Sequence, residues 1–123
     1  MPETITHING TTALLCAPDG KPLGTERDAI DLIGAAGGDG ATMVVIPAER
    51  LDDAFFRLST RTAGEFLQKF VNYGMRIAIL GDISPHLEES RALRAFVSES
   101  NRGNHIWFAT TIEDLTTRLA QTS

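Results

Sequence analysis

One stretch of this 123-residue chain, residues 55–84, constrains the fold more than any other. Apolar side chains recur there at i, i+3, i+4, i+7 and i+8 spacing, which predicts an amphipathic helix with the inward face Ala63, Phe66, Leu67, Phe70 and Val71. A tight turn at residues 72–74 follows, and then the mostly apolar run 76–80, typical of a strand covered on both faces. A helix that leads directly into a buried strand indicates a parallel sheet with helical crossovers.

The rest of the chain alternates strands and helices in the same way. Two short strands are expected within residues 4–16, joined by Asn9-Gly10, a dipeptide that favours a type I′ hairpin turn. A helix capped by Thr25 and a strand at 42–46 come next. After residue 84 we expect a third helix, broken or continuous, a strand at 105–109 and a final helix. The order β-β-α-β-α-β-α-β-α predicts one α/β domain, residues 1–123, with a mixed, mostly parallel sheet.

Helix starts carry local signals. Thr62 and Glu65 have the spacing of a capping box, and Ser84-Pro85 has the form of an N-cap followed by the first helical residue. Thr111 is expected to cap the last helix, whose predicted inward face is Ile112, Leu115 and Leu119.

Composition excludes several classes of partner and location. The net charge is −5 without a basic stripe, so neither nucleic acid nor an anionic membrane is an expected partner. The first ten residues lack the basic start and apolar core of a signal peptide, and no run approaches the ~18 apolar residues of a spanning helix. The single Cys16 cannot form an internal disulfide. Together these features predict a cytoplasmic protein.

Candidate binding residues gather where the predicted parallel strands end, because ligands of open α/β sheets bind at the carboxyl edge. These residues are Phe55, Phe56, Arg57, Thr60, Thr62 and Asp82. A hydroxyl-rich loop that runs into a helix N-terminus can bind an anion or accept a phosphate. The alternative is structural: the hydroxyls cap the helix and the two phenylalanines fill the edge of the core.

Asp82 directly follows a predicted strand, a position where catalytic carboxylates are found. Acid–base or metal chemistry there would need a partner such as Asp52 or Glu65. The alternative is that Asp82 caps the turn that leads into Ser84 and Pro85.

Signatures of common enzymes are missing from the sequence. The three histidines, His7, His86 and His105, lack metal-ligand spacing, and Cys16 lies in a predicted buried strand. The glycine-rich residues 34–40 follow a helix and precede a strand, the reverse of a phosphate-binding loop. The sequence therefore predicts no catalytic residue, metal or cofactor.

Long strings in this chain resemble a bacterial family described as domain of unknown function 4180. The strings lie at residues 55–58, 63–73, 77–82 and 99–103, and the similarity extends from the helix around Asp28 to the final helix. The resemblance implies a shared fold and no specific activity.

The element order is also similar to that of STAS domains, the fold of anti-sigma-factor antagonists and of transporter tails. In those regulators a serine or threonine at the corresponding helix start is phosphorylated, and the surrounding surface contacts a kinase. By position, that resemblance implies Ser59, Thr60 or Thr62 as the phosphorylated residue.

Three hypotheses of function follow. The first is a non-catalytic regulatory or protein-binding module that uses the loop at residues 52–62. The second is a small-ligand-binding protein or enzyme with a pocket near Phe55–Thr62 and Asp82. The third is a homodimer that pairs through its edge hairpin or a helix face.

Overall fold

Five strands form one sheet in the order β1-β2-β3-β4-β5 in the computed structural model, which describes residues 3–57 and 60–122. The strands are β1 (Glu3–Ile8), β2 (Thr11–Cys16), β3 (Met43–Pro47), β4 (Arg76–Leu80) and β5 (Ile106–Ala109). β1 pairs antiparallel with β2, and each of the remaining pairs is parallel. The predicted α/β domain with a mixed, mostly parallel sheet is confirmed.

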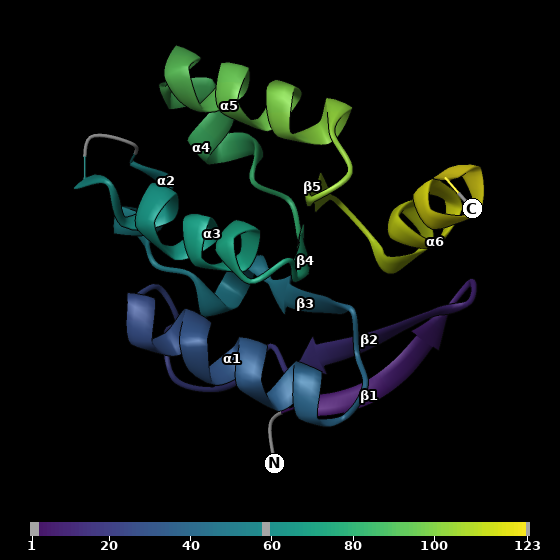
Figure 1. Cartoon of the computed structure of the whole chain (residues 1–123). Helices are drawn as coiled ribbons and strands as arrows, with labels where there is room; N and C mark the ends of the chain where they lie inside the picture. The colour runs from purple at the N-terminus through teal and green to yellow at the C-terminus, as the bar shows by residue number, and fades with distance from the viewer. Residues whose placement is uncertain (1–2, 58–59, 123) are drawn as a thin grey trace.

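The helices divide unequally between the two faces of the sheet. They are α1 (Glu26–Gly38), the 3-10 turn η1 (Ala48–Arg50), α2 (Asp53–Phe56), α3 (Thr62–Asn72), α4 (Ser84–Glu89), α5 (Arg91–Arg102) and α6 (Ile112–Thr122). Strands that are consecutive in the chain are also neighbours in the sheet, so crossovers of one hand bring their helices to the same face. Figure 1 shows α1, α3 and α5 together on one side and α6 on the other.

The two faces carry separate cores. On the side of α1, α3 and α5 the core is large and rich in aromatic rings, and includes Phe55, Phe66 and Phe70. The core under α6 is smaller and is built around Trp107, Leu115 and Leu119. Residues 43–46 of β3 are fully buried between the two, as their apolar run predicted.

The hairpin at the amino end of the chain holds the last helix in place. Asn9 and Gly10 have φ angles of 47° and 83°, which confirms the predicted two-residue turn. The Asn9 side-chain amide donates to the carbonyl oxygen of Thr116 in α6 at 2.7 Å. α6 therefore reaches from β5 back to the turn at the other side of the sheet (Figure 1).

Two predicted helix starts are wrong. The N-cap of α3 is Arg61 and not Thr62, because Arg61 adopts a left-handed backbone (φ 65°) and the helix begins one residue earlier than the capping-box spacing predicted. The N-cap of α4 is Ile83, so Ser84 lies inside the helix. The reciprocal capping box is instead at Thr25 and Asp28, at the start of α1.

The remaining predictions about helices have mixed outcomes. The third predicted helix is broken: α4 ends at Glu89, and the Ser90 hydroxyl accepts a hydrogen bond from the Leu93 amide as α5 begins. Thr111 accepts from the Asp114 amide at 3.1 Å, as predicted for a cap of α6. Two residues of the predicted inward faces do not face inward, because Ile112 of α6 is 39% exposed and Val71 of α3 is 41% exposed.

Candidate functional site

Two short helices meet at the carboxyl edge of the sheet, beyond the ends of β3 and β4. After β3 the chain passes through η1 to α2, whose first turn is capped by the Asp52 carboxylate, an acceptor for the Phe55 amide at 3.2 Å. After β4 the chain passes through Gly81 and Asp82 to α4. Adjacent parallel strands end side by side, so α2 and α4 become neighbours although about 30 residues separate them.

Gly81 permits this close approach. Its φ angle is 145°, which side chains of L-residues rarely adopt, and an added Cβ would lie 2.8 Å from Cβ of Ala48. Glycine at this position lets the exit of β4 pass directly against η1.

An aromatic stack joins the two helices. The rings of Phe56 on α2 and His86 on α4 lie 4.2 Å apart between centroids, with an interplanar angle of 13°. Phe56 also meets Phe55 edge to face at 5.3 Å, and Phe55 meets Phe66 of α3 in the same manner at 5.7 Å. The imidazole therefore rests on a ladder of rings that continues into the main core, which fixes its position.

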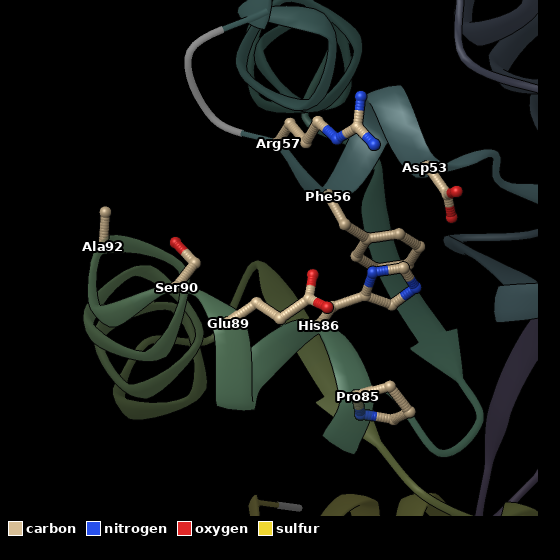
Figure 2. Close-up of a pocket in the computed structure, with 8 residues that line it drawn as sticks. All are labelled: Asp53, Phe56, Arg57, Pro85, His86, Glu89, Ser90 and Ala92. Atoms are coloured by element: carbon tan, nitrogen blue, oxygen red, sulfur yellow. The ribbon is translucent and has the colours of Figure 1, made fainter.

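A hollow of about 540 Å³, open to solvent, lies between these helices. We call it the α2–α4 groove and define it by its lining residues Asp53, Phe56, Arg57, Pro85, His86, Glu89, Ser90 and Ala92. Figure 2 shows the Phe56 and His86 rings meeting in the middle, with α2 on one side and α4 and the start of α5 on the other.

Charged side chains of both signs surround the stacked rings. Asp53 and Arg57 come from α2, and Glu89 comes from the last turn of α4; all three are exposed. Across residues 3–57 and 60–122, no ion pair joins any of these three groups to another side chain. Their charges are therefore available to a molecule that enters the groove.

Asp82 lies outside the groove and is engaged with Ser84. Its carboxylate accepts from the Ser84 amide at 3.0 Å and from the Ser84 hydroxyl. These two hydrogen bonds, the one from the hydroxyl first, lower the pKa of the exposed Asp82 carboxyl. Asp82 lines two neighbouring hollows of about 360 and 210 Å³, and the larger one shares Phe56 and His86 with the groove.

The other predicted binding residues are dispersed. Phe55 is 1% exposed and belongs to the core beneath Phe56. The Thr60 hydroxyl lies 2.6 Å from the carbonyl oxygen of Ala54 and 2.7 Å from that of Arg57, at the end of α2. Thr62, half-buried in the first turn of α3, lines a separate hollow next to α1. Ser59 lies outside the described residues. The structure thus brings only Phe56 and Arg57 of the predicted set into the groove.

Sequence reasoning missed His86 and Glu89 as members of the site, whereas Asp53 was included only as part of the loop at residues 52–62. His86 was considered only as a metal ligand, where its spacing fails. A usable signal was present, because Ser84-Pro85 placed His86 in the first turn of a helix directly after a parallel strand.

The family of the chain is shown by a comparison with family models. The model described as domain of unknown function 4180 matches residues 8–119, nearly the whole chain. The chain belongs to the domain of unknown function 4180 family. The region that matches this family contains every residue of the α2–α4 groove. No curated protein and no solved structure matches the chain, so the similarity of this family member to STAS domains stays a prediction.

Two kinds of feature are absent from residues 3–57 and 60–122 of this family member. No helix there is long and apolar enough to cross a membrane. No group of three or more His, Cys, Asp or Glu side chains there is arranged to hold a metal ion.

Proposed function

We propose that this chain is a regulatory protein-binding module of the cytoplasm whose α2–α4 groove receives a segment of a partner protein. The observation that carries the proposal is the Phe56–His86 stack, held 4.2 Å apart at the floor of an open groove. An aromatic floor with a polar, charged rim is the usual anatomy of a protein interface. Rigid anchoring on the core lowers the entropy cost of binding, because the rings are already in place.

The charges favour a partner segment with an apolar or aromatic anchor next to a basic residue. Asp53 and Glu89 supply two carboxylates, whereas Arg57 supplies one guanidinium. The anchor would lie against the stacked rings, and the basic residue would pair with a carboxylate at the rim.

The regulatory part of the proposal concerns Thr60. Its hydroxyl, a single donor, lies within hydrogen-bond distance of two carbonyl oxygens in the last turn of α2. A phosphate on Thr60 would remove this donor and place negative charge beside a helix C-terminus, which is unfavourable. Phosphorylation would therefore loosen α2 and with it Asp53, Phe56 and Arg57, which form one wall of the groove.

A pull-down from cell extract tests the binding surface. The bait proteins are wild type, the double variant Arg57→Ala/Glu89→Ala, and the control Arg27→Ala on the exposed surface of α1. A partner retained by wild type and the control but lost by the double variant would support the proposal. The binding proposal is abandoned if every partner, once purified, binds wild type and the double variant with the same affinity.

Matched variants at Thr60 test the regulation. Thr60→Ser keeps the hydroxyl, Thr60→Val removes it without adding charge, and Thr60→Glu adds charge. We expect affinity for the same partner to follow the order Ser, Val, Glu, from strongest to weakest. Equal affinities in Thr60→Ser and Thr60→Glu would refute the regulatory role and leave the binding proposal intact.

A second candidate function is small-ligand binding or catalysis in the same region. The groove volume of about 540 Å³ lies within the range of roughly 300–1,000 Å³ found for small-molecule sites. A fragment screen followed by NMR of the His86 ring protons distinguishes the two functions. Ring shifts caused by a small molecule, and absent in Phe56→Leu, would favour the ligand over a protein segment.

A further inference from the structure

The two edge strands of the sheet differ in how their outward backbone groups are satisfied. On β5 the backbone of Phe108 points away from β4, because its neighbours in the parallel ladder take the bonds to β4. The Asn101 side chain fills this edge: its amide accepts from the Phe108 N–H at 2.7 Å and donates to the Phe108 carbonyl at 3.2 Å. The outward backbone groups of Phe108 are thus already hydrogen-bonded within the same chain, so this part of β5 does not offer them to another strand.

The other edge strand, β1, is open. The two-residue turn makes Ile8 and Thr11 a hydrogen-bonded pair, so Glu3, Ile5 and His7 direct their backbone groups away from β2. Within residues 3–57 and 60–122, no hydrogen bond reaches the N–H or C=O of these three residues. β1 also contains neither the lysine nor the proline that commonly protects a sheet edge.

We propose that β1 pairs antiparallel with β1 of a second copy of this chain, about a two-fold axis at Ile5. In this register Ile5 lies opposite the second copy's Ile5, and Glu3 lies opposite the second copy's His7. Each of these is a hydrogen-bonded pair, so the outward groups of all three residues are satisfied in both copies. The two sheets then form one continuous sheet across the dimer.

Charge and backbone geometry select the same register. A carboxylate faces an imidazole at both ends of the pairing, where an imidazole N–H can donate a hydrogen bond to the carboxylate across the two strands. Sliding one copy by two residues in either direction pairs only two of the three outward residues of β1 with each other. Among the described residues of β1, the register centred on Ile5 therefore pairs the most outward backbone groups.

This contact is independent of the proposed function. β1 shares no residue with the α2–α4 groove, which is built from α2, α4 and the start of α5. Figure 1 shows β1 at the free edge of the sheet, on the far side from α4 and α5. Each copy in the dimer keeps its own groove.

Light scattering coupled to size exclusion tests the dimer at concentrations from about 1 µM to about 1 mM, where associations of moderate affinity are detected. Wild type should shift from monomer to dimer as concentration rises. Ile5→Pro should stay monomeric: its outward N–H takes no part in the β1–β2 ladder, and proline is tolerated on edge strands. The matched control, Ile5→Val, should dimerise, and circular dichroism verifies that both variants fold.

A charge swap tests the register. His7→Glu should weaken dimerisation about tenfold, because it sets like charges opposite each other at two places. Adding Glu3→Lys to that variant should restore the dimer, since each end then pairs lysine with glutamate. A merely structural effect of either change would not be rescued by the other.

Hydrogen exchange of single amides completes the test. In the dimer, the Ile5 and His7 amides should become protected as concentration rises. The proposal is overturned if wild type stays monomeric throughout, if Ile5→Pro still dimerises, or if the Ile5 amide exchanges quickly within the dimer.

Discussion

The guanidinium of Arg50 joins η1 to the loop that follows β2. Its Nη1 donates to the carbonyl oxygen of Ala17 at 2.9 Å, and its Nε donates to that of Lys21 at 2.8 Å. Arg50 is only 5% exposed, and its own carbonyl accepts from the Leu23 amide at 2.6 Å. One buried side chain thus holds a loop that lacks a helix or strand of its own.

Replacing Arg50 with methionine should destabilise the protein by about 1 to 3 kcal/mol, because the two part-buried hydrogen bonds to the carbonyl oxygens of Ala17 and Lys21 are lost. Urea unfolding followed by circular dichroism measures the change. Arg27→Met, at an arginine with an 84% exposed side chain, is the control and should change stability by less than about 0.5 kcal/mol. Equal effects of the two substitutions would contradict the role of Arg50.

Asn101→Ala should cost about 1 to 3 kcal/mol, because the outward N–H and C=O of Phe108 lose their partner. The same substitution at Asn72, whose exposed side chain accepts a hydrogen bond from Gln68 in the same helix, should cost far less. Urea midpoints of both variants provide the comparison. If Asn101→Ala unfolds at the wild-type midpoint, the amide does not stabilise the edge of β5.

Cys16 should resist thiol reagents in the native protein. Burial, with a smaller effect from Glu3, raises the pKa of the Cys16 thiol from 9.0 to about 11, so the reactive thiolate is scarce at neutral pH. Labelling with a chromogenic disulfide at pH 8 should be slow in buffer and fast in urea. Rapid stoichiometric labelling of the folded protein would show that the thiol is accessible.

In Asp82→Asn, the free energy of unfolding should fall less than in wild type as the pH is lowered into the acid range. Hydrogen bonds from Ser84 lower the pKa of the folded Asp82 carboxyl below its unfolded value near 3.9. The ionised Asp82 carboxylate therefore adds its full contribution to the free energy of unfolding above the unfolded pKa. This contribution is lost as the pH falls through the folded pKa.

Urea unfolding at a series of pH values between about 2 and 6 measures this effect. Asp19→Asn, at an exposed carboxylate in the loop after β2, serves as the control. The interpretation fails if Asp82→Asn loses as much stability between the two ends of the series as wild type does.

Several parts of the fold were predictable because their signals are local. The Asn9-Gly10 turn, the cap at Thr25 and the buried strand at 76–80 each depend on a few adjacent residues, and each is present as predicted. The cap of α3 was wrong because the left-handed Arg61 precedes it, and the sequence carries no glycine or asparagine to signal that conformation.

The candidate site was predictable only in part. Phe56 and Arg57 were identified because the end of a parallel strand is a known place for ligands. Their partners His86 and Glu89 come from another loop, and nothing in their spacing along the chain links them to Phe56. Phe55 and Phe56 look equivalent in sequence and both are buried in the core, yet only Phe56 also lines the groove.

By itself, the sequence determined the element order and the mostly parallel sheet, because hydrophobic periodicity and turn residues act over a few positions. It also determined the family, through the resemblance of long residue strings that the family model confirms over residues 8–119. Only the tertiary structure decided which side chains meet. The stacking of Phe56 on His86, the burial of Arg50 and the closing of β5 by Asn101 each join residues from different elements. Such contacts depend on how strands align in the sheet, which is a property of the whole packed chain.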